Sequence, residues 1–120
     1  MRKIILALLV LSAPAAAQAM SVSQFLGKVD ALHKKGPMAL FSKDIGLLKA
    51  EVKDAGKALR LEQNVALKTG RKPPVCMPKR ATTDSDELLA HFRAIPPAQR
   101  GMSVKSAFAA LMNKKYPCPA

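Results

Sequence analysis

The stretch that decides the fold runs from Pro73 to Cys118 and reads PPVCMPKRATTDSDELLAHFRAIPPAQRGMSVKSAFAALMNKKYPC. It holds both cysteines of the 120-residue chain, Cys76 near its start and Cys118 at its end. Two short amphipathic segments lie between them, so a bond between the cysteines would tie a helical hairpin. This pattern predicts a small all-α domain whose central loop is joined to the C-terminus by one disulfide.

Both helices of this stretch have recognisable ends. Asp84 and Glu87 have the spacing of a capping box at the start of the first helix, and Pro96 stops it. Ser103 caps the second helix. The faces that we expect to be buried carry apolar residues at three- and four-residue steps, namely Leu88, Leu89, Phe92 and Ile95 in the first helix and Val104, Ala107, Phe108, Leu111 and Met112 in the second.

Two further helices are predicted before this stretch, which makes four main helices. Residues 21–35 repeat apolar side chains on one face and end at Gly36, which supplies a left-handed stop. A short apolar turn then leads into the longest helix, which starts at Ser42 or Asp44 and ends near Lys68. The stripe of this helix expected to be buried consists of Ile45, Leu48, Val52, Ala55, Leu59 and Ala66.

The N-terminal residues have the pattern of a secretory signal peptide over residues 1–19. Arg2 and Lys3 precede eight consecutive apolar residues, and a small-x-small cleavage signal ends at Ala19. The apolar run is too short to span a bilayer, and a buried N-terminal helix is the alternative. We expect cleavage after Ala19, which leaves a single α-helical domain over residues 20–120 in the periplasm.

Export determines how the cysteines are interpreted. In an oxidising compartment Cys76 and Cys118 pair most simply with each other, and two free thiols are the alternative. A bridge that closes so long a loop contributes about 4 kcal/mol in the chain-entropy model. No other run of the chain is long and apolar enough to cross a membrane.

The chain is strongly basic, with a formal net charge of +12 that falls to +10 when the leader is removed. A basic chain favours an anionic partner, and an anionic envelope component or an acidic protein fits an exported chain. Nucleic acid is disfavoured because stacking aromatics are scarce: there is no Trp, and the phenylalanines lie at helix-core spacing. A solvated basic surface is the alternative interpretation.

A row of cations follows one face of the longest helix. Lys49, Lys53, Lys57 and Arg60 recur at three- and four-residue steps, where like charges mildly destabilise a helix. A row that opposes helix stability favours a role in binding, so we predict Lys53, Lys57 and Arg60 as partner contacts. A solvated face with no partner is the alternative.

No residue pattern for catalysis or metal binding occurs in the chain. His33 and His91 stand alone, the cysteines are expected to be bridged, and the acidic cluster at residues 84–87 is explained by helix capping. Core filling explains Met38 and Met112 better than a copper site does. We therefore expect no enzyme activity, no catalytic residue, no cofactor and no metal.

Three motifs stand in an order that resembles the C-terminal half of a known family. They are Cys76-Met77-Pro78, Ile95-Pro96-Pro97 and Tyr116-Pro117-Cys118. The region is similar to the Rap/Tai family, whose members are small, exported, all-helical immunity proteins of type VI secretion systems. In that family a Cys-x-Pro start, a helix, a short break of the His-Pro type and an Ala-rich helix lead to an aromatic-Pro-Cys ending, and Ile95-Pro96-Pro97 stands where the break belongs.

The resemblance covers about residues 74–119, and the preceding half of the chain departs from it. Family members tend to carry a cysteine beside a Gly-Tyr pair on the long helix, whereas residues 53–63 contain Gly56 without Cys or Tyr. The resemblance implies a non-enzymatic periplasmic binder, monomeric or homodimeric, that blocks a secreted peptidoglycan amidase. The alternatives are a periplasmic chaperone resembling the HdeA type and a basic, envelope-associated structural protein.

Overall fold

The computed structural model describes residues 20–119 of the chain. These residues form four α-helices and two short 3-10 helices with no strand, which confirms the predicted all-α class. The predicted signal peptide at residues 1–19 lies outside the described residues. The elements are α1 (Val22–Lys35), η1 (Gly36–Phe41), α2 (Lys43–Lys68), α3 (Ser85–Ala94), η2 (Pro97–Gln99) and α4 (Val104–Lys115).

The α-helices start where the sequence predicts because a side chain there accepts a hydrogen bond from an exposed backbone N–H. The Ser21 hydroxyl accepts from the Gln24 N–H at 3.1 Å, and the Gln24 side chain accepts from the Ser21 N–H at 3.0 Å. This reciprocal pair is a capping box. Ser42, Asp84 and Ser103 cap the other three helices by single bonds of the same kind.

The capping box predicted at the start of α3 forms only in part. The Asp84 carboxylate accepts from the Glu87 N–H at 2.7 Å, as expected. The Glu87 carboxylate instead accepts from the Thr83 hydroxyl at 3.2 Å and from the Lys115 ammonium at 2.9 Å. The tertiary fold brings Lys115 of α4 to this point, so Glu87 joins two helices.

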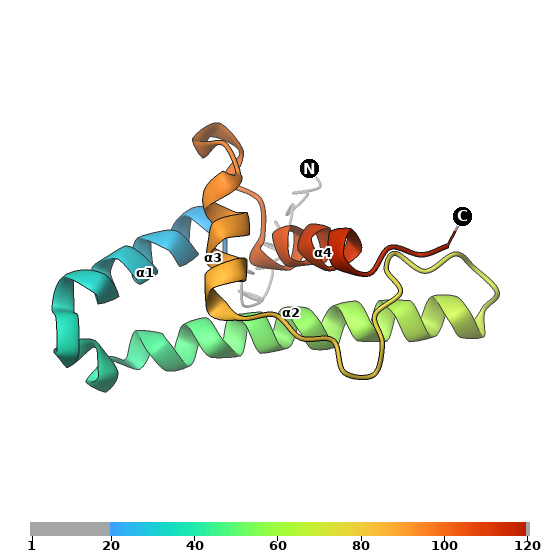
Figure 1. Ribbon diagram of the computed structural model, residues 1–120, viewed down its shortest axis with the longest axis horizontal. Helices are drawn as coiled ribbons and strands as arrows, with labels where there is room; N and C mark the ends of the chain where they lie inside the picture. Colours follow the sequence, from blue (N-terminus) through green and yellow to red (C-terminus); the bar gives the residue numbers. More distant parts are fainter. Residues whose placement is uncertain (1–19, 120) are drawn as a thin grey trace, which may run out of the picture.

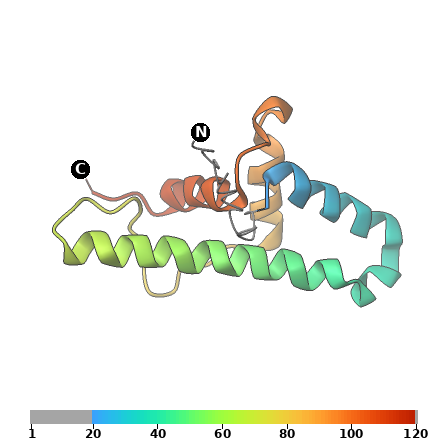
Figure 2. The ribbon, with the colours of Figure 1, turned by 180° about the vertical axis from the view of Figure 1, so that it is seen from behind.

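The long helix α2 is the support on which the other helices lie. Its 26 residues span about 39 Å at 1.5 Å per residue. Figures 1 and 2 show α1 beside the first half of α2, α4 along its second half, and α3 standing across the space between α1 and α4. η1 makes the bend that joins α1 to α2 at one end of the molecule.

One hydrophobic cluster connects all four α-helices. At its centre the Phe25 ring of α1 meets the Phe92 ring of α3 edge to face, with centroids 5.3 Å apart. Such aromatic pairs contribute about 0.5–1.5 kcal/mol beyond the area that they bury. The predicted stripe of α2 is confirmed at Leu48, Ala55, Leu59 and Ala66, which are buried, whereas Ile45 and Val52 are half-buried.

The central loop consists of residues 69–83, between the end of α2 and the capping residue of α3. Its Val75 and Met77 side chains are buried on either side of Cys76, so the loop packs against the core. Cys76 is bonded to Cys118, which confirms the predicted disulfide, and the Cys76 N–H donates to the Tyr116 carbonyl at 3.1 Å. The loop therefore contributes to the core in addition to linking α2 with α3.

The buried Gln63 side chain of α2 holds this loop in place. Its Nε2 donates to the Met77 carbonyl at 3.0 Å, and its Oε1 accepts from the Met77 N–H at 2.9 Å. Both hydrogen-bonding groups of one loop residue are thereby satisfied by a single amide. Among the described residues, Gln63 is the one buried polar side chain. The apolar pattern of α2 did not predict its burial.

The prediction that Met38 fills the core is wrong, and so is the core position expected for Phe41. Their side chains are 67% and 84% exposed, and Leu40 between them is 80% exposed. The reason is their position, because η1 forms the bend between α1 and α2 and these three side chains lie on the side of the bend that faces away from the core. Gly36 has the expected positive φ of 56°, although its ψ of −134° lies outside the left-handed helical region. Met112 is buried, as predicted.

Replacing Gly46 by alanine is expected to raise the free energy of unfolding by about 0.5–1 kcal/mol, because alanine favours a helix interior. A Cβ at Gly46 would meet nothing within 4 Å, and one at Gly56 would touch the Phe108 ring at an ordinary 3.8 Å. Urea unfolding of Gly46→Ala and of the wild-type chain measures this difference in the free energy of unfolding. Gly70→Ala is the matched control and should destabilise, because Gly70 has a φ of 69°. A loss of stability in Gly46→Ala would contradict the prediction.

Candidate functional site

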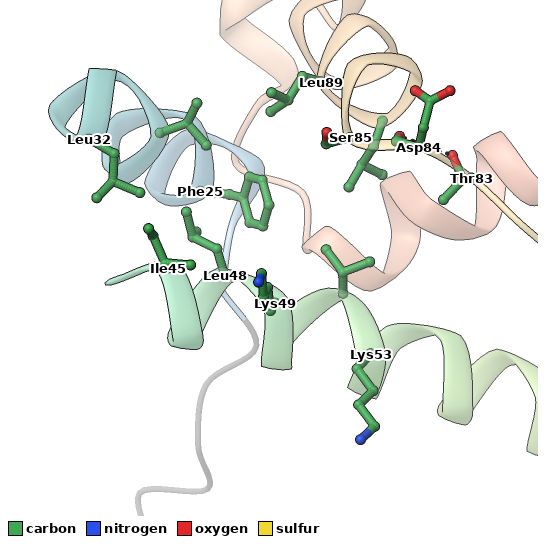
Figure 3. A pocket seen from close by; sticks show the side chains of 13 residues that line it. Phe25, Leu32, Ile45, Leu48, Lys49, Lys53, Thr83, Asp84, Ser85 and Leu89 are labelled. Atoms are coloured by element: carbon green, nitrogen blue, oxygen red, sulfur yellow. Dashed lines mark hydrogen bonds between the residues drawn. The ribbon is translucent and has the colours of Figure 1, made fainter. Parts of the chain in front are cut away.

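A surface hollow of about 430 Å³ opens between α1, α2 and α3 (Figure 3), and we call it the α1–α3 hollow. Phe25 of α1, Leu48 of α2 and Leu89 of α3 point toward one another across it. Its volume lies in the range typical of small-molecule and peptide-binding sites, which are also lined mainly by apolar side chains. The apolar lining residues are Phe25, Val29, Leu32, Ile45, Leu48, Val52, Leu88 and Leu89.

The hollow exists because α3 is short. Its 10 residues cover only part of the apolar faces that α1 and α2 present. Ile45, Val52 and Leu89, which the sequence places in the core, are left half-buried at the surface. The same periodicity that builds the core therefore also builds the apolar walls of the hollow.

The edge of the α1–α3 hollow is polar and carries unlike charges on opposite sides. Lys49 and Lys53 of α2 are exposed along one side. In Figure 3 the Lys53 side chain points away from the apolar walls, and Lys53 is exposed to solvent. Thr83, Asp84 and Ser85 form the opposite side at the start of α3, where the Asp84 carboxylate is engaged as the helix cap.

A second hollow of about 360 Å³ lies farther along α2, between that helix, the central loop and α4. We call it the α4 hollow. It shares Thr83 with the α1–α3 hollow, so the two depressions meet at this residue. Its walls include Gly56 and Lys57 of α2 and Phe108 of α4.

The three cations predicted as partner contacts do not have equivalent surroundings. Lys53 and Lys57 are exposed, and they line the α1–α3 hollow and the α4 hollow respectively. The Arg60 guanidinium donates to the Met77 carbonyl at 3.0 Å and to the Pro78 carbonyl at 2.6 Å. Arg60 therefore helps to hold the central loop, and only the two lysines keep ammonium groups directed to solvent.

The most exposed apolar side chains lie in η1, and we call Met38, Leu40 and Phe41 together the η1 tip. A shallow depression under η1 shares Val29, Leu32 and Ile45 with the α1–α3 hollow, so the tip and the hollow adjoin. Large exposed apolar groups that lie together mark an interaction surface. Exposed lysines flank the tip at positions 34, 35 and 43.

Sequence reasoning missed the η1 tip, although a signal was present. Residues 38–41 follow a Gly-Pro pair and connect two helices that must both face one core. Four residues in so tight a bend cannot all turn inward. An apolar run in a very short connection is therefore better interpreted as a contact surface than as core.

Among residues 20–119, no three His, Cys, Asp or Glu side chains lie close enough together to hold a metal ion. None of the helices in this range combines the length and the apolar character that a membrane span requires. The His91 ring is half-buried, with Nε2 at 3.0 Å from the Ala107 carbonyl, whereas His33 is exposed.

Comparison of the chain with protein-family models, with curated proteins and with solved structures finds no match.

Proposed function

We propose that the mature chain is a periplasmic, non-enzymatic binding protein of the immunity type, which inhibits a peptidoglycan amidase delivered by a competing cell. The observation that carries the proposal is the α1–α3 hollow, an apolar depression with a cationic side that adjoins the exposed η1 tip. Apolar anchors around a depression are typical of surfaces that bury a protein partner. The resemblance of residues 74–119 supplies the class of partner.

Inhibition in this proposal is by occlusion. The η1 tip supplies the apolar anchors, and the α1–α3 hollow receives side chains of the amidase. Lys49 and Lys53 pair with carboxylates at the edge of the contact, where charge complementarity raises the association rate and the specificity. A stable complex of this kind buries about 800 Å² on each partner.

The experiment that tests this function is a pull-down with mature Met20–Ala120 as bait. A panel of peptidoglycan amidases and a periplasmic extract are passed over it at low and at high salt. We expect one amidase to be retained at high salt and to lose its activity, because an interface with an apolar centre resists screening. Salt-labile capture of many envelope components would contradict the proposal and support the envelope-associated alternative. The same pull-down repeated at acid pH tests the chaperone alternative, which predicts capture of many unfolded proteins.

Replacing Phe41 by alanine separates binding from folding. Phe41 is 84% exposed, so the free energy of unfolding should change by less than about 0.5 kcal/mol. Affinity for the retained amidase should fall about 30-fold, because a truncated aromatic anchor costs about 2 kcal/mol of binding free energy. Calorimetric titration of the amidase with each variant measures this.

The matched control is Leu67→Ala. Leu67 is 59% exposed and lies near the end of α2 far from η1. Its truncation removes a similar exposed apolar group outside the proposed contact, so we expect affinity to be unchanged. Equal losses of affinity in the two variants would exclude the η1 tip as the specific contact.

A further inference from the structure

The backbone nitrogen of Met20 lies against a carboxylate of the long helix. It donates to Glu51 Oε1 of α2 at 3.0 Å. Both residues are half-buried, so this contact is partly shielded from water. Met20 is also the residue that would become the N-terminus if the predicted leader is cleaved after Ala19.

The fold holds Met20 in this position from a second direction. Its carbonyl accepts from the Val104 N–H at 2.8 Å, and the Val22 N–H donates to the Met102 carbonyl at 2.9 Å. Between these bonds, Ser21 pairs with Ser103 in an isolated antiparallel bridge. The segment before α1 is thus tied to the start of α4, and these bonds direct the Met20 nitrogen at α2.

Glu51 is well suited to receive a positive charge. No Lys or Arg of the described part of the chain pairs with it, although four other acidic residues form ion pairs there. Lys28 and Asp44 line a surface depression together with Met20, but they pair with each other at 3.4 Å. The Glu51 carboxylate is therefore left to the Met20 nitrogen.

We propose that Glu51 is the binding site for the α-ammonium group that removal of the signal peptide creates on Met20. The inference rests on the export that the proposed function includes. Hydrolysis of the Ala19–Met20 bond by a signal peptidase adds the hydroxyl of water to the Ala19 carbonyl carbon and leaves an amine on Met20. The amine takes up a proton from solvent and becomes an ammonium group at neutral pH.

Cleavage then changes the strength of the contact without changing its position. Before cleavage, Glu51 accepts one hydrogen bond from a neutral amide; afterwards it faces a full positive charge, and charge-assisted bonds are about twice as strong. The chain therefore gains this stability only after translocation, in the same compartment in which the disulfide can form. A less stable precursor suits a chain that must stay unfolded to be exported.

The test compares two purified, oxidised chains, one beginning at Met20 and one beginning at Ala17, each with and without Glu51→Gln. The longer chain keeps the Met20 N–H but moves the terminal charge away. Urea unfolding is measured at pH 6.5, where α-amines are protonated and carboxylates ionised. We expect Glu51→Gln to raise the unfolding equilibrium constant about fivefold more in the chain that begins at Met20 than in the longer chain.

The matched control is Asp54→Asn, an exposed carboxylate one turn farther along α2, whose effect should be the same in both chains. An equal effect of Glu51→Gln in both chains would overturn the proposal, because the charge would then contribute nothing. Mass measurement of the exported protein supplies a second readout, and a mature chain that begins at a residue other than Met20 would also overturn it. Neither measurement needs an amidase, so the proposal can fail independently of the immunity role.

Discussion

Replacing Cys76 and Cys118 together by serine is expected to lower the free energy of unfolding by about 4 kcal/mol. The two cysteines are separated by 42 residues, and the entropy that a crosslink removes from the unfolded chain grows with the length of the loop. A domain of this size has a total stability of only about 5–15 kcal/mol. We therefore expect the variant to be partly unfolded at physiological temperature.

The native contacts around the bridge should keep the fold recognisable in what remains folded. Tyr116 lies beside the central loop, since its carbonyl accepts from the Cys76 N–H and its hydroxyl accepts from the Thr82 N–H at 3.3 Å. Lys115 also donates to the Thr82 carbonyl. These bonds hold the C-terminal end of α4 against the loop in addition to the disulfide, so we expect the bridge to act mainly on the unfolded state.

The measurement is urea unfolding of the wild-type chain and the double variant, each with and without a reductant. Reduction should destabilise the wild-type chain by about the same 4 kcal/mol and leave the double variant unchanged. Equal stability of the reduced and oxidised wild-type chains would contradict the prediction. A large reductant effect in the double variant would show that the loss comes from another source.

Replacing Gln63 by alanine is expected to lower the free energy of unfolding by about 2–3 kcal/mol. The Met77 N–H would lose its acceptor in a buried site, and an unsatisfied buried donor costs about 1–3 kcal/mol. The Met77 carbonyl would keep the Arg60 guanidinium as a donor. The loss should therefore come mainly from the orphaned N–H and from the packing of the truncated side chain.

Hydrogen exchange gives a local readout of this effect. The Met77 amide should be protected in the wild-type chain and should lose that protection in Gln63→Ala. Gln63→Met keeps the shape of the side chain but none of its hydrogen bonds, so it isolates the polar contribution. Asn64→Ala, an exposed neighbour on the same helix, should change stability by less than about 0.5 kcal/mol. If Gln63→Met were as stable as the wild-type chain, the two hydrogen bonds between Gln63 and Met77 would contribute nothing to the free energy of unfolding.

The Cys76→Ser/Cys118→Ser and Gln63→Ala variants both act on the loop that lines the α4 hollow. The central loop that Gln63, Arg60 and the disulfide hold in place forms one wall of the α4 hollow. The loop ends at Thr83, where the α4 hollow meets the α1–α3 hollow. Loosening the loop is therefore expected to disturb the wall of the α4 hollow while leaving the η1 tip, at the other end of α2, unaffected.

The candidate site was only partly predictable, because the relevant pattern in the chain has two meanings. Apolar residues at helical spacing predict burial, and they do so correctly for Leu59 and Phe92. The same spacing at Ile45 and Leu89 places side chains in the wall of an open hollow. Periodicity specifies which face of a helix turns inward, but it does not specify whether another helix is long enough to cover that face.

By itself the sequence determined the features whose causes are local. Ser21, Ser42, Asp84 and Ser103 start the helices because each accepts a hydrogen bond within the first turn, and two cysteines allow only one intramolecular pair. The tertiary structure alone decided the contact of Gln63 with Met77, the use of Arg60 within the fold and the pairing of Met20 with Glu51. Each of these depends on groups at least fourteen residues apart. Such distances are set by packing of the whole chain and leave no trace in local spacing.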